Sequence, residues 1–187
     1  MLATQNPIES EGTYPLPEAQ VDRFLMKILV DYPAPGDEAA VVDRSLAPVS
    51  DVAERLSVHD LMHFRQAVGD VIVDREVIDY SVALADATRR PGRHGLTEVE
   101  PLISYGASPR GPIGLIHAAR ALALLRGRRH VLTSDVRDLA PEVLRHRLVL
   151  SYEGLSEGAR PDDLLEQIME AVPEPDLRGA DTERLAV

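Results

Sequence analysis

A polar turn and a charged pair near the start of the chain have residue types suited to phosphate chemistry. Residues 2–5 look like the end of a strand, Asn6 precedes a proline, and a short acidic helix near 17–20 leads to Asp22 and Arg23. A residue before proline is pushed out of the helical region, which places Asn6 in a turn at the strand end. Arginine is always charged, and its planar fork of donors matches a phosphate. This order of features is typical of the edge of a nucleotide-hydrolysing sheet.

A second stretch, Gly-Ala-Ser-Pro-Arg-Gly at residues 106–111, opens a predicted helix. Ser108 is a candidate cap, and Pro109 suits the first helical position. Arg110 then lies in the first turn, where exposed backbone N–H groups carry partial positive charge. The stretch also approaches the GxSxG pattern of serine hydrolases. Arg110 occupies the place of the final glycine and no strand precedes it, so a hydrolase with Ser108 as nucleophile is disfavoured.

The sequence around these residues predicts how they are positioned. Residues 24–30 are a nearly continuous apolar run, which fits a strand covered on both faces, as in a parallel sheet. Two strands cannot make such a sheet alone, and we expect its other strands upstream of residue 1. The Pro-Gly stretch at 33–36 predicts a domain boundary.

After that boundary the pattern is helical, with Ser57 as a candidate cap and Ser134 at another helix start. The predicted helices are 37–46, 57–69, 74–89, 109–127, one from 134, and 161–171. The positions expected to face inward are Val77, Ile78, Val82, Leu84, Ile113, Ile116, Ala119, Leu122, Leu125, Val136, Leu139, Val143 and Leu144. We therefore predict a mainly α protein in three parts: the end of an α/β core at 1–32, a helical domain at 33–172 and a disordered tail at 173–187.

Composition excludes several classes of function. The 187 residues are 44% hydrophobic but only 4% aromatic, a composition that suits packed helices. The formal net charge of −11 disfavours sequence-independent binding to nucleic acid, which depends on cationic contacts. No cysteine is present, so no disulfide or thiolate metal site is expected, in keeping with a cytoplasmic protein. No apolar run approaches the roughly 20 residues that span a bilayer, so no membrane association is expected.

The sequence contains no complete site for hydrolysing a nucleotide. The motif GxxxxGK[ST] needs a lysine before Ser or Thr, and the only lysine, Lys27, precedes Ile28. Residues 71–74 superficially resemble the apolar run with acidic end that places Mg²⁺, but Arg75 stands where a second acid is expected. We therefore expect the chain to be unable to hydrolyse ATP by itself.

The two stretches together resemble the MoxR family of AAA+ ATPases. The resemblance rests on Ala-Thr-Gln-Asn-Pro at 3–7, its continuation through 12–24, the stretch 106–111 and residues 139–153, and it extends from 2 to about 172. It implies a helical AAA+ lid domain preceded by the last two strands of a P-loop α/β core.

The resemblance implies a role for each of three residues. Asn6 corresponds to sensor 1, which helps to place the attacking water, and Arg23 to the arginine finger, which reaches a neighbouring subunit's γ-phosphate. Arg110 corresponds to sensor 2, which reaches the nucleotide phosphates. The alternatives are a simple turn at Asn6, a surface Arg23 paired with Asp22 or Glu18, and a solvated Arg110.

The resemblance also implies partners and activity for the intact parent protein. These are a homo-oligomeric ring, usually hexameric, with ATP and Mg²⁺ at subunit interfaces, and a von Willebrand factor A-type companion. Hydrolysis would drive chaperone-like remodelling or metal and cofactor insertion in client proteins. The alternative is a non-catalytic helical interaction module or a truncated relic.

A competing pattern is the pair His59 and His63, which stand at i and i+4 of a predicted helix with Asp60 between them. The pattern is close to the HExxH motif of zinc proteases. Aspartate is one methylene shorter than the usual general base, and no third ligand follows. No metal site is therefore predicted.

Overall fold

The computed structural model describes residues 2–4, 16–48 and 53–175. Asn6 and most of the predicted tail therefore lie outside the described residues. The described helices are α1 (Glu18–Val21), α2 (Pro35–Leu46), α3 (Val58–Gly69), α4 (Arg75–Arg89), α5 (Arg110–Leu125), α6 (Thr133–Leu144), α7 (Tyr152–Ser156) and α8 (Pro161–Ala171), with 3₁₀ turns η2 (Pro91–His94), η3 (Glu100–Leu102) and η4 (Arg145–Arg147). The predicted mainly α class is confirmed.

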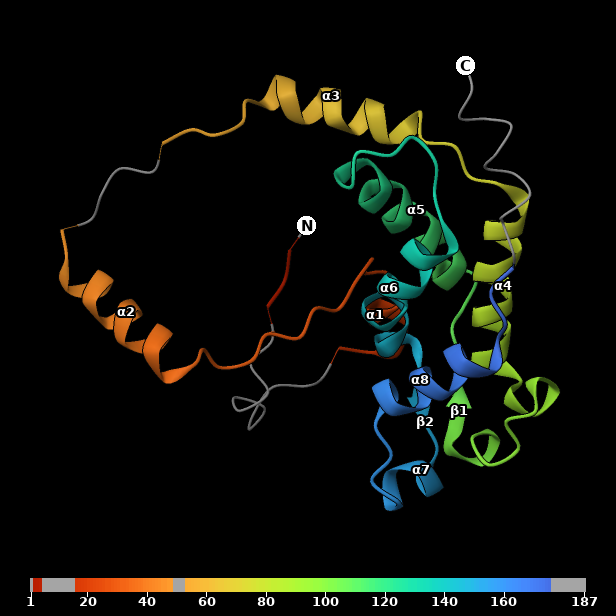
Figure 1. Ribbon diagram of the computed structural model, residues 1–187. Helices are drawn as coiled ribbons and strands as arrows, with labels where there is room; N and C mark the ends of the chain where they lie inside the picture. Colours follow the sequence, from red (N-terminus) through yellow and green to blue (C-terminus); the bar gives the residue numbers. More distant parts are fainter. Residues whose placement is uncertain (1, 5–15, 49–52, 176–187) are drawn as a thin grey trace.

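Four helices, α4, α5, α6 and α8, form the body of the molecule (Figure 1). Their facing sides are built from Leu, Val, Ile and Ala. The side chains that are fully or almost fully buried include Val77, Leu84, Leu115, Ala119, Val136, Val143, Leu144, Leu165 and Ile168. Burying such side chains contributes roughly 1.5–3 kcal/mol each, so this cluster accounts for most of the stability of the fold.

Small residues let α5 approach α6 closely. The buried face of α5 carries Gly111, Gly114, Ala118, Ala119 and Ala123. A Cβ added at Gly114 would lie 3.1 Å from a methyl group of Val143 on α6, which is tighter than ordinary contact. The N-terminal turns of α5 therefore pack directly on α6, and this packing fixes the backbone position of Arg110 at the start of α5.

A two-stranded antiparallel sheet pairs the segment just before residues 106–111 with the segment after α6. Strand β1 (Ile103–Tyr105) pairs with β2 (Val149–Leu150), with Ile103 opposite Leu150. Sequence reasoning missed this pairing, because each strand is too short to show a periodic pattern. It closes the body on the side where the segment 106–111 begins.

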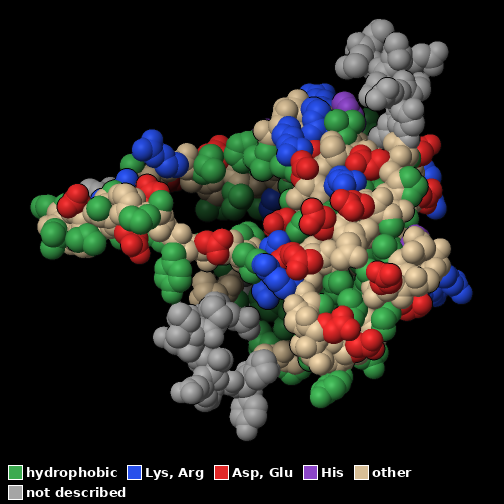
Figure 2. Space-filling view, turned by 60° about the horizontal axis from the view of Figure 1, so that its bottom comes forward, with side chains coloured by type: hydrophobic (Ala, Val, Ile, Leu, Met, Phe, Trp, Pro, Cys, Tyr) green, Lys and Arg blue, Asp and Glu red, His purple; other side chains and the backbone are tan. Residues whose placement is uncertain are grey.

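Helix α2 lies apart from the body, whereas helix α3 runs over α5 and contacts it (Figure 1). Helix α3 begins as predicted at Ser57, whose hydroxyl accepts from the Asp60 N–H while the Asp60 carboxylate accepts from the Ser57 N–H. Figure 2 shows apolar side chains on the arm that projects from the body. The exposed apolar residues of α2 are Val41, Val42 and Leu46.

The strand predicted at residues 24–30 is not formed. Residues 22–25 are turn and bend, and the chain from Met26 to Ala34 has no regular structure. Residues 2–4 form no strand either. A strand is stable only when a neighbouring strand pairs with its backbone. Among the described residues, no strand lies next to 24–30 or 2–4. The apolar run is left exposed, with Ile28 at 68% and Val30 at 89%.

Most helix bounds agree with the sequence prediction, but three inward assignments are wrong. Val82, Ile113 and Leu125 are exposed. The buried face of α4 instead runs through Tyr80 and Ser81, and that of α5 through its glycines and alanines. The prediction assigned large apolar residues to the inward faces. Where two helices pack closely, small residues occupy the contact instead.

Candidate functional site

The candidate site is built where the segment after α1 meets the start of α5. Helix α1 ends at Val21, and Asp22 N–H donates to the Glu18 carbonyl at 2.9 Å. The next two N–H groups, of Arg23 and Phe24, donate to Gln20 and Val21 at 3.1 Å. The turn therefore holds Asp22 and Arg23 in a compact, hydrogen-bonded bend rather than in an extended strand.

The end of α4 holds the segment 106–111. The Ala107 N–H donates to Thr88 Oγ1 at 2.9 Å, and Arg89 Nε donates to the Ala107 carbonyl at 2.5 Å. A Cβ at Gly106 would overlap the Thr88 carbonyl group, so only glycine fits there. These contacts fix the backbone just before Ser108.

Helix α5 begins one residue later than predicted, and Ser108 is not its N-cap. Helix α5 has Pro109 at its N-cap, and the Arg110 N–H donates to Ser108 Oγ at 3.1 Å. The Ser108 hydroxyl in turn donates to the Asp22 carboxylate, with both oxygens at 2.9 Å. Ser108 therefore links the two stretches.

The Asp22 carboxylate is the centre of the site. Besides Ser108, it accepts from Arg110 Nη1 at 3.2 Å and from Arg147 Nε at 3.1 Å. The side chain of Asp22 is 18% exposed, that of Arg147 is 3% exposed, and that of Arg110 is 55% exposed. One carboxylate thus pairs with a buried arginine on one side and with a solvent-facing arginine on the other.

Arg147 binds the backbone on both sides of Arg23. Its Nη2 donates to the carbonyls of Asp22 at 3.1 Å and Phe24 at 2.7 Å, and its Nη1 donates to that of Leu25 at 3.3 Å. Nη1 also bonds the Val143 carbonyl. Burial lowers the pKa of Arg147, and the charge and hydrogen bond of Asp22 oppose that shift. The guanidinium remains charged, because an arginine pKa starts far above neutrality.

His146 packs against the same segment. Its Nε2 lies 3.1 Å from the Phe24 carbonyl and 2.8 Å from Arg147 Nη1, so the tautomer decides which of the two it bonds. Its Nδ1 is buried without a partner in the described residues. Burial, and then the neighbouring Arg147 charge, lower the pKa of His146 to about 4. The imidazole is therefore neutral at pH 7.

The structure brings two of the three predicted site residues to one place. Arg23 is exposed and directly follows Asp22, and Arg110 is ion-paired to Asp22. Within the described residues the Arg23 side chain has no ion pair, so the pairing with Asp22 or Glu18 that was the alternative to a finger is not made. Asn6 lies outside the described residues.

Sequence reasoning named Asp22 and Ser108 but not the contact between them, and it missed Thr88 and Arg147. Arg147 did carry a signal, since it is a charged residue immediately before the apolar run Leu148-Val149-Leu150. A buried charge requires a partner. That partner lies 125 residues away in the sequence and could not be read from local patterns.

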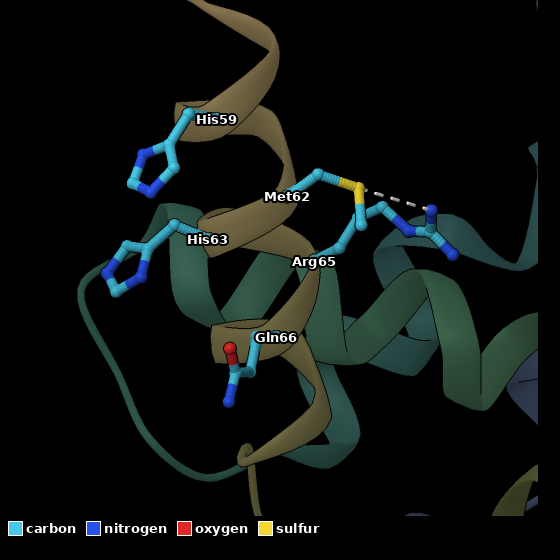
Figure 3. A pocket seen from close by; sticks show the side chains of 5 residues that line it. All are labelled: His59, Met62, His63, Arg65 and Gln66. Atoms are coloured by element: carbon cyan, nitrogen blue, oxygen red, sulfur yellow. Dashed lines mark hydrogen bonds between the residues drawn. The ribbon is translucent and has the colours of Figure 1, made fainter.

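The pair His59 and His63 lies on an exposed face of α3, in a shallow depression lined also by Met62, Arg65 and Gln66 (Figure 3). Both imidazoles project on the same side of the helix (Figure 3). Asp60 is engaged by Ser57, whose hydrogen bonds lower the Asp60 pKa. No group of three or more His, Asp or Glu side chains that could hold a metal ion occurs in the described part of the chain. The pair therefore gains no third ligand there.

Hydropathy of the described helices gives one further constraint. None of them is both long and apolar enough to cross a membrane.

Comparison with known proteins connects this geometry to a class. The family model for the AAA lid domain matches residues 96–168, and the model for the ATPase family associated with various cellular activities (AAA) matches residues 1–26. The first match covers α5 and α6, and the second includes Arg23. The fold and the site therefore define the class: the chain carries an AAA+ lid domain together with the end of an AAA+ core.

The particular family follows from the individual relatives. Chaperone MoxR1 of Mycobacterium tuberculosis is 43% identical over 175 residues, which are 94% of this chain and 46% of MoxR1. Protein MoxR of Methylorubrum extorquens is 35% identical over 191 residues, covering 94% of this chain and 55% of that protein. The chain belongs to the MoxR family of AAA+ ATPases.

A solved structure agrees with this assignment. A candidate ATPase from Cytophaga hutchinsonii matches with a TM-score of 0.86 and 38% identity, over 91% of this chain and 52% of that one. The chain spans about half the length of the curated relatives it matches.

Proposed function

We propose that the chain is the C-terminal part of a MoxR-type AAA+ ATPase and that Arg23 and Arg110 both act on the phosphates of ATP. The observation that carries this proposal is the place of Asp22 between the two arginines. Asp22 directly precedes Arg23 and is ion-paired to Arg110 at 3.2 Å. Arg23 and Arg110 are therefore attached to one connected part of the structure, Arg23 through the backbone and Arg110 through an ion pair, and this arrangement supports a shared ligand.

The residues present fit a bound triphosphate. Arg110 is 55% exposed and stands in the first turn of the 16-residue helix α5, where the helix dipole favours an anion. Arg23 is exposed and has no ion pair within the described residues. Both side chains therefore remain available to an anion from outside the lid, and Arg110 would exchange only a half-exposed ion pair for a phosphate. Such pairs contribute about 0–1 kcal/mol, so the exchange costs little.

ATP with Mg²⁺ supplies the reactive phosphoryl group and its energy. The residues of this chain would bind and orient it: Arg23 and Arg110 neutralise phosphate charge, and Asn6 would help to place the attacking water. The P-loop lysine and the Mg²⁺-holding acids are expected from a segment that this sequence does not include. Because Arg23 as a finger reaches the nucleotide of a neighbouring subunit, the tie through Asp22 supports Arg110 acting on that same nucleotide.

The assembly follows from the finger. An arginine that completes the site of a neighbour requires a homo-oligomeric ring, and we propose a hexamer. The name of the M. tuberculosis relative supports a chaperone-like task, namely remodelling of client proteins or insertion of a metal or cofactor, in the cytoplasm. A von Willebrand factor A-type protein is the proposed companion.

A hybrid protein tests this proposal. The part of M. tuberculosis MoxR1 that precedes the matched region is joined to this chain, and ATP hydrolysis is measured as released phosphate. Replacing Arg23→Ala or Arg110→Ala is expected to lower the turnover number by at least about a hundredfold, the scale known for arginine fingers. The matched control is Arg75→Ala, an exposed arginine paired only with Asp79. Rings that hydrolyse ATP equally with Arg23 and Arg23→Ala would overturn the finger assignment.

A further inference from the structure

Two arginines from distant parts of the sequence, Arg110 and Arg147, bind the carboxylate of Asp22. Arg110 stands 88 positions after Asp22 and Arg147 stands 125 positions after it, yet both guanidinium groups meet at its carboxylate. Arg147 is 3% exposed and Arg110 is 55% exposed. The buried arginine is thus part of the packed body, whereas the exposed one can move.

Asp22 stays fixed when Arg110 leaves it. Ser108 Oγ donates to both carboxylate oxygens at 2.9 Å, and Arg147 Nε donates to Oδ1 at 3.1 Å. These two partners lie in or beside the body and do not depend on Arg110. The carboxylate therefore keeps its place and its charge compensation if the Arg110 guanidinium turns to a phosphate.

Arg147 also fixes the backbone that carries Arg23. Its donors reach the carbonyls of Asp22 and Phe24, the residues on either side of Arg23. The adjacent chain is held as well, since the Lys27 N–H donates to the Glu142 carbonyl at 2.8 Å and Arg145 Nη1 donates to the Lys27 carbonyl at 2.9 Å. The backbone at Arg23 is therefore anchored to α6 and η4, while its side chain has no ion pair in the part of the chain that the structure describes.

We propose that Asp22 and Arg147 are positioning residues for one triphosphate: Arg147 anchors the backbone that carries Arg23, and Asp22 holds the Arg110 guanidinium beside that backbone until Arg110 turns to the phosphate. This inference rests on the proposed function. Positioning of charged donors before the reaction is a large source of rate, because the site need not reorganise as charge develops. The pair Asp22 and Arg147 would supply that preorganisation without touching the nucleotide.

Hydrogen exchange on the 187-residue chain tests the anchoring without any nucleotide. Asp22→Asn and Arg147→Lys are expected to speed exchange of the amides at 22–27 by at least about tenfold, because local opening of this segment becomes easier. Amides within α4 should keep their rates. Asp138→Asn, which removes the charge of an exposed partner of Arg126, is the matched control and should leave 22–27 unchanged. Equal exchange in Asp22→Asn and the unaltered chain would overturn the proposal.

Kinetics of the hybrid protein then separate positioning from stability. Asp22→Asn is expected to lower kcat by at least about tenfold with KM changed less than about twofold, and Asp22→Glu should restore part of the rate. In the hybrid protein with Asp22 unchanged, the double variant Arg23→Ala with Arg110→Ala should lose kcat by a smaller factor than the product of the two single losses. The shortfall should be at least about fivefold. In the Asp22→Asn background the two losses should multiply.

The outcomes distinguish this inference from the proposed function. Large losses for Arg23→Ala and Arg110→Ala with an unchanged kcat for Asp22→Asn would leave the function standing and overturn the positioning role. Unchanged rates for both arginine variants would overturn the function itself, whatever the exchange data show.

Discussion

Arg147 Nε donates to Asp22 Oδ1 at 3.1 Å, and this bond joins the last turn before β2 to the bend after α1 across 125 residues of sequence. The same guanidinium donates to the carbonyls of Asp22, Phe24, Leu25 and Val143. A single buried side chain therefore holds the N-terminal segment on the lid.

Arg147→Lys should destabilise the chain by about 3 kcal/mol, because breaking a buried ion pair leaves Asp22 and several carbonyls without their donors. An ammonium group cannot replace the planar fork. The measurement is the free energy of unfolding in urea at pH 7. Arg137→Lys is the control, since its side chain is 39% exposed, and it should change stability by less than about 1 kcal/mol. Equal losses in both variants would contradict the anchoring role of Arg147.

Acidification should destabilise the chain between pH 6.5 and about 4, because the pKa of His146 is lowered to about 4 in the folded state. The unfolded chain then binds more protons than the folded one, so stability is complete above pH 6.5 and falls as pH decreases. The largest slope for one group is about 1.4 kcal/mol per pH unit. The charges facing His146 are Arg147, Lys27 and Asp22.

Urea unfolding at pH 7, 6 and 5 measures this slope, and His146→Gln should reduce it. Carboxylates elsewhere contribute to both proteins and cancel in the difference. A slope that is identical in the two proteins between pH 7 and 5 would show that His146 is not the titrating group.

Local sequence patterns predicted the helices well because each begins or ends at a residue with a local reason. Ser57 caps α3 through Asp60, and Pro161 begins α8 as expected. The candidate site was predicted only in part. Arg23 and Arg110 stand in recognisable motifs, but Asp22 and Arg147 meet through contacts between distant segments. The prediction of a strand at 24–30 was wrong. An apolar run indicates that its residues favour burial, but it does not identify the neighbouring segment that would cover them.

Gly106→Ala should destabilise the chain by about 1–3 kcal/mol, the usual cost of forcing atoms into a filled space. The added methyl group would meet the Thr88 carbonyl, so the segment 106–111 must move away from the end of α4. Gly36→Ala is the control, because nothing lies within 4 Å of its Cβ position in α2. That change should stabilise or be neutral, since alanine favours helix over glycine by up to about 1 kcal/mol. Thermal unfolding of both variants decides the comparison.

Asp135→Asn should be among the most damaging single changes outside the site. The side chain is 0% exposed and is paired with Arg126 at 2.8 Å and Arg128 at 2.5 Å, and it caps α6 through the Leu132 N–H. Loss of its charge leaves two cations facing an uncharged amide, at a cost of about 3 kcal/mol. Asp138→Asn makes the same substitution at a side chain that is 49% exposed, and it should lower the free energy of unfolding by less than about 1 kcal/mol. Chemical denaturation of the pair provides the test.

The exposed run after the bend should make the chain associate. Ile28 and Val30 are 68% and 89% exposed, and apolar surface of this kind promotes self-association. Removing residues 1–34 would delete that surface but also every partner that Arg147 has at Asp22, Phe24 and Leu25. A shorter chain therefore gains solubility only at the expense of a buried, unpaired arginine.

Two charged substitutions separate these effects. Ile28→Asp with Val30→Asp leaves the bonds of Lys27 and Arg147 in place and should shift the chain towards monomer in light scattering, with stability changed by less than about 1 kcal/mol. The chain that begins at residue 35 should also be less associated, yet it should unfold at a lower urea concentration, because Arg147 has lost its carboxylate. Association that persists unchanged in the doubly substituted chain would place the self-contact elsewhere, on the apolar residues of α2 or α3.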